Sequence, residues 1–378
     1  MGYCTLNCNE YANGVSTHSD ILNYRSVVIS RERARKVGKP RQTEMPEIDL
    51  ANCRLCHPEN LDGKPRIYEY CDGRVGMFEN SAPYMPFDPQ VIFMRHPDQE
   101  IAKRAMHVWK MEQIRMFDLY YIVNAIVIRG GEFAVKPIRH TDLPRMVAGF
   151  NIGPMAGQSL PHLHGQYGWE VVLDRVNLSD TEIALFYEEM RREDLLLYEN
   201  NDGNPYKILA PWTPRGQYHL SLHFPKVYEI HRLTEVEMRT FAYVGHTIIK
   251  RYLELGIRNM NIVFRSSPHN REIEPVMVEF IPRVNTPALY EFLGRDVVDT
   301  PPSMIFNTFV NINFRQINSE IASYNPADEY DTAVQNAREA IENESGPSTP
   351  PPPPPGPDSL PPSGAAADEE EEGKKHKK

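Results

Sequence analysis

The chain has 378 residues, of which 41% are hydrophobic and 24% are charged, and its formal net charge at pH 7 is −10. This composition is typical of a globular protein with a large core in one or two domains, and the negative charge disfavours a nucleic-acid-binding surface, although a local basic patch could still hold phosphates. No apolar run approaches the ~18 residues of a membrane span and the N-terminus lacks an apolar signal core, so we expect a cytoplasmic protein without membrane contact.

The two ends of the chain differ in composition from its middle. Residues 1–20 are polar and rich in asparagine, and we expect them to be loosely ordered. Residues 345–378 contain six consecutive prolines, an acidic run and a lysine-rich end. Such a composition cannot bury enough apolar surface to offset its ordering entropy, so we expect this tail to be disordered. The alternative is that the proline run docks on a partner protein.

Between these ends, hydrophobic periodicity predicts an α+β fold made of two similar halves, residues 21–200 and residues 201–344. In each half the predicted order is strand, helix, strand, strand. The first half has a strand at 90–94, a helix at 100–119 and strands at 120–128 and 145–151. The second half has a strand at 218–224, a helix that begins at Thr234 and ends near Leu255, and strands at 259–265 and 275–282.

The chain has five cysteines, and two of them form the spacing Cys53-x-x-Cys56. An odd number of cysteines in a cytoplasmic chain favours free thiols or a metal site over disulfides. A two-residue gap lets both thiolates reach one tetrahedral cation. A redox pair and unrelated free thiols are the alternatives.

The strongest functional pattern lies at residues 157–166, which read GQSLPHLHGQ. On an extended segment, His162, His164 and Gln166 project onto one face. A neutral imidazole is a good nucleophile toward phosphorus, and a neighbouring glutamine can hydrogen-bond a phosphoryl oxygen. Small residues around them let backbone N–H groups approach an anion. The alternative is a pair of histidines on a half-exposed strand.

This pattern, Gly-x-Ser-x-Pro-His-x-His-Gly-Gln, resembles the active-site motif of the galactose-1-phosphate uridylyltransferases, the transferase branch of the histidine-triad superfamily. The hydrolase branch usually has a third histidine at the position of Gln166. Upstream, residues 150–153 match the family's Phe-Glu-Asn-Lys-Gly segment, with Asn151 and Gly153 in register. The resemblance covers roughly residues 20–300 and implies a duplicated histidine-triad fold, with helices packed on an antiparallel sheet.

The resemblance also implies a structural zinc ion. In this family a Cys-x-x-Cys at this distance before the active site binds zinc together with the first histidine of the His-x-His pair, which implies Cys53, Cys56 and His162 as ligands. The fourth ligand is usually a histidine after a Pro-Asp pair, where this chain has His96-Pro97-Asp98. Either His96 or Asp98 could serve, and we favour His96 because imidazole suits zinc beside two thiolates.

The resemblance further implies which residues contact the substrate. Residues 27–36 form a predicted strand and a basic cluster, where the family has a Val-Ser-x-x-Arg-Ala-x-Arg segment that approaches the diphosphate. A solvated basic loop is the alternative, and lysine at position 36 supplies charge without the bidentate fork of arginine. Residues 78–80 resemble the family's Phe-x-Asn, whose asparagine contacts the nucleoside. The implied substrate-binding residues are Arg33, Lys36, Asn80, Asn151, Gly153 and Ser159.

The second half departs from the family's pattern. Many members have a His-x-His near the last strand as part of a second metal site, but residues 276–282 read VMVEFIP, so we expect that site to be absent. Residues 294–296 read GRD where the family has a Gly-Tyr-Glu segment that contacts the sugar, which leaves the acceptor open. The other histidines on predicted core elements are interpreted as structural: His219, His223, His231 and His246.

The activity that the resemblance implies is nucleotidyl transfer by double displacement. His164 attacks the α-phosphorus of a nucleoside diphosphate sugar, Gln166 hydrogen-bonds the phosphoryl oxygens, and a phosphorylated acceptor then takes the nucleotide. The implied donor is UDP-glucose and the implied acceptor is galactose 1-phosphate, in carbohydrate metabolism, with a homodimer among the assemblies that it allows. The alternatives are a phosphorylase that uses inorganic phosphate, a histidine-triad hydrolase, which Gln166 disfavours, and a non-catalytic nucleotide-binding protein.

Overall fold

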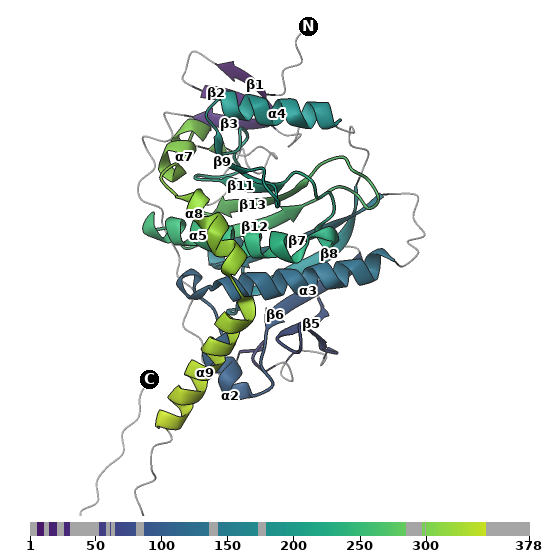
Figure 1. Ribbon diagram of the computed structural model, residues 1–378, viewed down its shortest axis with the longest axis vertical. Coiled ribbons are helices and arrows are strands. Elements are labelled where there is room, and N and C mark those ends of the chain that lie inside the picture. The colour runs from purple at the N-terminus through teal and green to yellow at the C-terminus, as the bar shows by residue number, and fades with distance from the viewer. Residues whose placement is uncertain are drawn as a thin grey trace, which may run out of the picture.

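Figure 1 shows the computed structural model of the chain, in which long helices lie across one large sheet. The structure describes the backbone of residues 6–10, 15–20 and 26–30, and it describes residues 53–57, 61, 65–80, 87–135, 143–172, 179–284, 297–298 and 300–344. The proline-rich tail at 345–378 lies outside these residues. None of the described helices is both long and apolar enough to cross a membrane.

The large sheet has ten strands in the order β4-β5-β6-β8-β7-β12-β13-β11-β10-β9. Every neighbouring pair in it is antiparallel. The strands are β4 (Tyr68–Tyr70), β5 (Val75–Glu79), β6 (Phe87–Met94), β7 (Leu143–Ile152), β8 (His164–Val172), β9 (Leu196–Asn200), β10 (Tyr206–Leu209), β11 (Leu220–Phe224), β12 (Met260–Arg265) and β13 (Val276–Pro282).

The strand order is symmetric about the central pair of β7 and β12. Moving outward from this pair, the first half gives β8, β6, β5 and β4, and the second half gives β13, β11, β10 and β9. Each half also contributes one long helix between its third and fourth strands in chain order, α3 (Met116–Ala134) and α5 (Glu235–Glu254). The predicted α+β fold, with two similar halves on one antiparallel sheet, is therefore confirmed, although in the first half the helix and one of the strands are not where the sequence predicts them.

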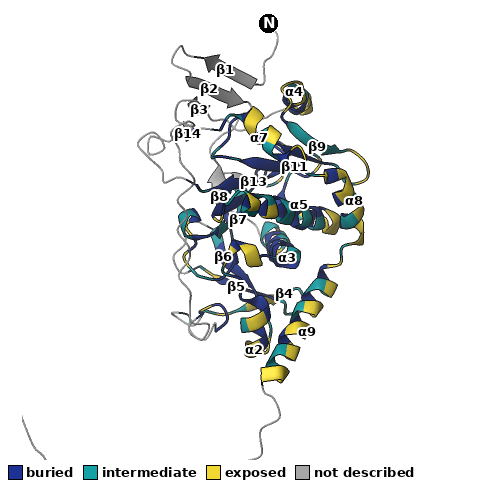
Figure 2. Ribbon diagram, turned by 90° about the vertical axis from the view of Figure 1, so that its left-hand side faces the viewer, coloured by how far each residue is buried: buried dark blue, intermediate teal, exposed yellow. Residues whose placement is uncertain are grey.

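The helix α3 corrects one sequence prediction, because it contains the predicted strand at 120–128. The run YYIVNAIVI is rich in β-branched and aromatic residues, and it lacks an amphipathic period because α3 is buried on most sides. The helix packs closely on β8, where a Cβ atom on Gly165 would lie 2.6 Å from Ile122 Cγ2. Figure 2 shows α3 and α5 as mostly buried helices beside the sheet.

The start of α5 follows the sequence prediction. Thr234 is the N-cap, and Glu237 accepts a hydrogen bond from the Thr234 backbone N–H at 2.7 Å. The Thr234 hydroxyl in turn accepts a hydrogen bond from the Glu237 N–H, which completes a capping box. These contacts depend on residues three positions apart, so the local sequence is sufficient to define this helix start.

The predicted helix at 100–119 is interrupted. Its first part consists of α2 (Gln99–Ile101), the π-helical segment η3 (Ala102–Met106) and the 3-10 turn η4 (Met111–Gln113), and regular helix begins again only with α3. The cause of the break is visible at Val108, whose carbonyl accepts a hydrogen bond from Leu163 N–H at 2.5 Å. The backbone at this point therefore pairs with the His-x-His segment rather than with the helix.

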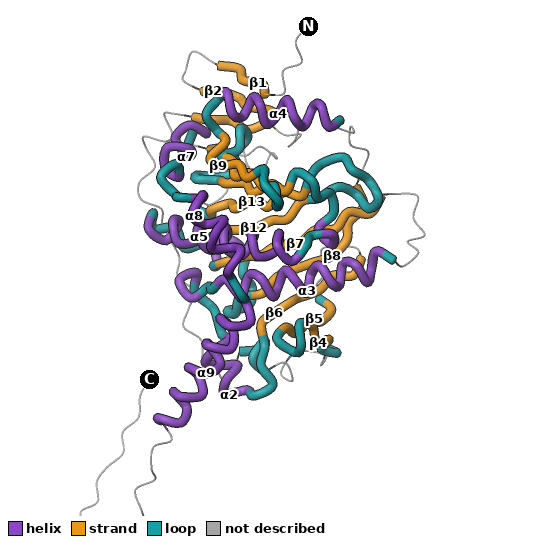
Figure 3. Tube along the Cα trace, viewed as in Figure 1, coloured by secondary structure: helices purple, strands orange, loops and turns teal. Residues whose placement is uncertain are grey.

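The remaining elements surround the large sheet, as Figure 3 shows. A separate four-stranded sheet has the order β1-β2-β3-β14. Two of its strands lie within residues 1–20, which were expected to be loosely ordered. The four strands of this small sheet are β1 (Leu6–Glu10), β2 (Val15–Asp20), β3 (Ser26–Ser30) and β14 (Val297–Val298). The remaining helices are α4 (Asp180–Arg192), α7 (Pro302–Phe309), α8 (Phe314–Ser323) and α9 (Pro326–Glu344).

The last helix, α9, returns to the first half of the chain. Its Glu329 accepts a hydrogen bond from the Phe117 N–H in the first turn of α3, at 3.0 Å. The Tyr330 ring contacts the rings of Phe117 and Tyr121 edge to face, with centroid distances of 5.6 Å and 5.9 Å. A carboxylate at a helix N-terminus and buried aromatic contacts both stabilise this docking.

We expect Gly149→Ala to destabilise the joint between the two halves. Gly149 lies on β7, and a Cβ atom there would lie 2.3 Å from the Ile262 carbonyl oxygen on β12. Overpacking of this kind costs about 1–3 kcal/mol. The matched control is Gly131→Ala on α3, where a Cβ meets nothing within 4 Å and helix propensity predicts a gain of up to about 1 kcal/mol. Denaturant unfolding of both variants measures the difference, and equal stabilities would contradict this account.

Candidate functional site

His164 is the first residue of β8 and is 2% exposed. Its Nδ1 atom lies 2.8 Å from the backbone carbonyl oxygen of His162. A carbonyl oxygen can only accept, so Nδ1 donates its proton and Nε2 is left as the basic nitrogen of a neutral ring. Burial lowers the pKa of His164, which favours this neutral form. The site therefore presents an imidazole in the tautomer that a nucleophile requires.

Gln166 follows two residues later on the same face of β8 and is partly buried. Asn151 on the neighbouring strand β7 donates to Gln166 Oε1 from Nδ2, at 3.4 Å. Asn261 on β12 donates to Asn151 Oδ1 at 2.6 Å, and Arg283 donates to Asn261 Oδ1 at 2.5 Å. This row of amides joins the two halves, so residues of the second half orient Gln166 through Asn151.

The loop before His164 depends on Gly153. Its φ is +83°, and a Cβ atom there would lie 2.2 Å from Asn259 Oδ1, so only glycine fits. The Gly153 N–H donates to Gln158 Oε1 at 2.7 Å, and Gln158 Nε2 donates to the Leu160 carbonyl at 2.9 Å. The Gly153 amide is thus used inside the loop, whereas Ser159 lies exposed on it.

Four buried side chains form a group that could bind a metal ion. Cys53, Cys56, His107 and His162 offer ligand atoms that all lie within 4.8 Å of one another. Nδ1 of His162 lies 3.4 Å from Cys53 Sγ and 3.5 Å from Cys56 Sγ. Contact with the Cys56 thiol, and then with the two imidazoles, lowers the pKa of the Cys53 thiol against the opposing effect of burial. The group therefore favours a thiolate among its ligands.

The donor set fits a tetrahedral cation. With usual bond lengths of about 2.3 Å to sulfur and about 2.0 Å to nitrogen, tetrahedral geometry separates the two ligand atoms by about 3.5 Å. The observed separations from His162 Nδ1 to the two sulfur atoms, 3.4 Å and 3.5 Å, are close to this value. The Nε2 atom of His107 is also buried without a hydrogen-bond partner. These observations agree with two thiolates and two imidazoles around one ion.

The fourth member of this group is His107, whereas the sequence analysis expected His96 or Asp98. His96 Nδ1 accepts a hydrogen bond from the Asp98 N–H at 3.0 Å, outside the group. Asp98 is the N-cap of α2 and accepts from the N–H groups of Glu100 and Ile101. His107 takes the position instead because the chain is extended after η3 and runs beside the His-x-His segment. No local pattern in the sequence distinguishes His107, since its partners are far away along the chain.

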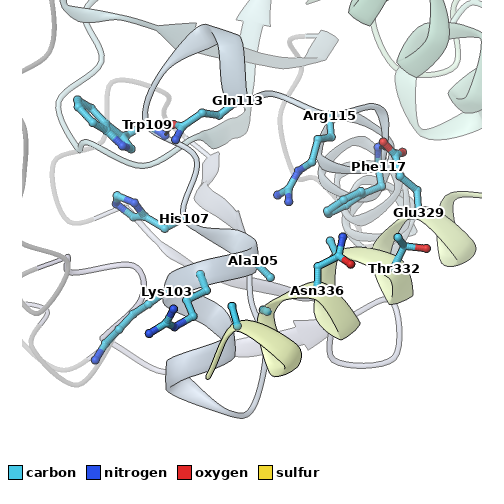
Figure 4. A pocket seen from close by; sticks show the side chains of 14 residues that line it. Lys103, Ala105, His107, Trp109, Gln113, Arg115, Phe117, Glu329, Thr332 and Asn336 are labelled. Carbon is cyan, nitrogen blue, oxygen red and sulfur yellow. Dashed lines mark hydrogen bonds between the residues drawn. The ribbon is translucent and has the colours of Figure 1, made fainter. Parts of the chain in front are cut away.

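A cavity of about 780 Å³ lies between residues 103–117 and α9. Figure 4 shows Lys103, His107 and Trp109 on one side of it and Thr332 and Asn336 on the other. It is lined by His107, whereas the nucleophile candidate His164 and its neighbour Gln166 are not among the described residues that line it. This cavity therefore borders the metal group and is distinct from the surface around His164.

The structure describes some of the other site residues that the sequence predicted. Asn80 directly follows β5, whose Phe78 pairs with Val91, and Val91 pairs with Gln166 on β8. Asn80 therefore lies two strands from Gln166, beyond the end of β5. Arg33 and Lys36 lie outside the described residues.

The symmetry of the sheet also shows what the second half has at the position of His164. The central strands β7 and β12 pair at Phe150 and Ile262, and these pair in turn with Gly165 on β8 and Phe280 on β13. The residues before these two, His164 and Glu279, are therefore equivalent. Glu279 is buried, and its Oε1 lies 3.6 Å from a guanidinium nitrogen of Arg265. The second half thus carries an ion-paired carboxylate where the first half carries the imidazole.

The order of strands and helices gives a fold of the duplicated histidine-triad type. Among solved structures, the chain is similar to an ADP-glucose phosphorylase from Arabidopsis thaliana with bound ADP-glucose, at 14% identity and a TM-score of 0.60, over 79% of this chain and 99% of that one. It is also similar to a GalT-like protein from Arabidopsis thaliana, at 13% identity and a TM-score of 0.57, over 79% and 99% of the two chains.

These structural neighbours confirm the resemblance to GalT-like proteins at the level of the fold. No protein-family model matches the chain, and no curated protein matches it in sequence. At 13% and 14% identity this similarity shows the fold of this chain and does not establish its substrate. Its chemistry must be argued from the site.

Proposed function

We propose that this protein transfers a nucleoside monophosphate group through a covalent bond to His164. The observation that supports the proposal best is the environment of this side chain, buried and held at Nδ1 by the carbonyl of His162 at 2.8 Å. A ring fixed in this tautomer presents Nε2 as a nucleophile without first losing a proton.

In the first step, His164 Nε2 attacks the α-phosphorus of a nucleoside diphosphate sugar. A bond forms between nitrogen and phosphorus, the bond from phosphorus to the bridging oxygen breaks, and a sugar 1-phosphate leaves. The His162 carbonyl stabilises the positive charge that develops on the ring. Asn151 donates to Gln166 Oε1, and the amide N–H group of Gln166 is the donor that we propose for a phosphoryl oxygen.

In the second step, a phosphate oxygen of the acceptor attacks the same phosphorus and the bond to His164 breaks. The donor that we propose is UDP-glucose, and the acceptor is a sugar 1-phosphate such as galactose 1-phosphate. Inorganic phosphate is the second candidate acceptor, and the similarity in fold to an ADP-glucose phosphorylase supports it. Asn80, Asn151 and Ser159, with Arg33 and Lys36, remain our proposed substrate contacts.

We also propose that the ion held by Cys53, Cys56, His107 and His162 is zinc, because two thiolates and two imidazoles suit it. When bound, it would act structurally as a tetrahedral cross-link without an open coordination position. His162 would then be fixed at its ring by the ion, while its carbonyl holds His164. The ion would therefore fix the segment that presents the nucleophile.

Mass spectrometry of the intact protein tests the proposal. The protein is incubated separately with UDP-glucose, ADP-glucose and GDP-glucose in the absence of an acceptor. We expect one of them to add the mass of one nucleoside monophosphate, and peptide mapping to place it on His164. Adding galactose 1-phosphate or inorganic phosphate to the labelled protein then identifies the acceptor by which of them removes the label. An adduct on another residue would contradict the proposal.

A further inference from the structure

A second group of metal-ligating side chains lies on the other face of the large sheet. Glu229 and His231 lie at the 3-10 turn η6 (Ile230–Arg232), and His269 lies in the turn after β12. Both imidazoles contact Trp169 of β8, with ring centroids 6.2 Å and 5.8 Å away. Side chains alternate along a strand, so Trp169 points to the face opposite His164. This group is therefore separate from the nucleophile.

The three side chains converge on one carboxylate oxygen. Nδ1 of His269 lies 2.7 Å from Glu229 Oε2, and Nδ1 of His231 lies 3.8 Å from the same atom. The three ligand atoms all lie within 4.8 Å of one another. The side chains of Glu229, His231 and His269 are 4%, 10% and 17% exposed. Two nitrogen donors and one oxygen donor thus meet in a site largely removed from water.

The hydrogen bond between His269 and Glu229 does not give the buried ring of His231 a partner. Its Nδ1 atom is buried and has no hydrogen-bond partner, because 3.8 Å is too long for a hydrogen bond to Glu229. A buried polar atom without a partner costs about 1–3 kcal/mol. Because this nitrogen is aimed at the oxygen that His269 already contacts, a cation between the three atoms would satisfy it.

The surroundings support a cation site with an open position. Arg232 lies 3.0 Å from the other carboxylate oxygen, Glu229 Oε1, and so holds Oε2 toward the two imidazoles. The Arg232 side chain is 55% exposed, so water screens its charge from a bound cation. A cavity of about 460 Å³ is lined by Glu229 and Arg232, whereas His231 and His269 are not among the described residues that line it.

We propose that Glu229, His231 and His269 bind a divalent first-row transition metal ion, with Zn²⁺ as the ion to test first. Two imidazoles and one carboxylate suit such an ion, whereas Mg²⁺ and Ca²⁺ prefer all-oxygen sites. With three protein ligands, the ion keeps a fourth position for water. His231, which the sequence analysis interpreted as structural, is therefore a metal ligand.

Metal analysis of the full-length protein tests this proposal. The protein is loaded with Zn²⁺, desalted and analysed for bound metal. We expect two equivalents in the wild type and one equivalent in His231→Ala, because this variant removes a ligand but keeps the hydrogen bond between Glu229 and His269. Cys53→Ser is expected to lose the other equivalent. Glu229→Gln keeps the shape of the side chain and is expected to behave like His231→Ala.

Cobalt substitution distinguishes the two sites by their spectra. A thiolate site gives sulfur-to-cobalt charge-transfer absorption, which we expect to be lost in Cys53→Ser and kept in His231→Ala. His246→Ala, which changes a histidine on α5, is the matched control and should bind metal like the wild type. Equal metal content in the wild type and His231→Ala would overturn the proposal. Nucleotidyl labelling of His164 should be the same in His231→Ala, so the test is independent of the proposed function.

Discussion

His164→Ala is expected to abolish nucleotidyl labelling and to lower turnover by at least about 10⁴-fold, because it removes the proposed nucleophile. The variant should fold, since His164 contacts the metal group only through the backbone of His162. Intact-mass analysis measures the adduct, and steady-state kinetics of the wild type should be ping-pong. His231→Ala, on the other face of the sheet, is the control that should label normally.

Gln166→His tests why the intermediate is transferred rather than hydrolysed. A glutamine cannot act as a general base for an attacking water, whereas a histidine can. The wild-type adduct should therefore persist in buffer, and the variant should release free nucleoside monophosphate. Turnover that survives in His164→Ala, or an adduct that is equally stable in Gln166→His, would contradict the assigned mechanism.

The second large effect is expected when a ligand of the buried metal group is removed. Cys53→Ser should lose one equivalent of zinc and unfold at a lower temperature, because an ion that binds only the folded state stabilises it. At an ion concentration about 1,000 times the Kd, this stabilisation is about 4 kcal/mol. Metal analysis and thermal unfolding of the same samples measure both effects.

Two histidine variants distinguish the fourth ligand that the structure indicates from the one that the sequence predicted. His107→Ala should lose metal as Cys53→Ser does, because His107 lies in the group with the two thiols. His96→Ala should keep its metal, because His96 contacts only the Asp98 segment in the described hydrogen bonds. Metal loss in His96→Ala together with full retention in His107→Ala would reverse this assignment.

Where the partners of a residue are close in sequence, the sequence was sufficient to predict the local structure. The cap at Thr234 needs only Glu237, three positions away, and the structure shows both of its hydrogen bonds. The spacing of His164 and Gln166 on an extended strand likewise places both on one face, whatever the rest of the fold does. In the second half, local periodicity likewise predicted the order of strand, helix, strand and strand that the structure shows in β11, α5, β12 and β13.

Where a helix is buried on most sides, its sequence lacks an amphipathic period, and the prediction of secondary structure was wrong. The run at 120–128 has the composition of a buried strand, and only the packing of α3 on the sheet and on its helical neighbours shows it to be a helix. The interruption at 102–115 had no local signal either. It arises because Val108 pairs with Leu163, a contact between residues that are distant along the chain.

The tertiary structure alone decided which residues complete the two sites. His107 joins Cys53 and Cys56 because its segment lies against the His-x-His loop, and Asn261 orients Asn151 because β12 pairs with β7. His231 and His269 meet at Glu229 in the same way, from a helical turn and a strand end. The placement of His164 and Gln166 could be predicted from the sequence because it depends on strand periodicity, whereas these partners depend on sheet register and packing between distant segments.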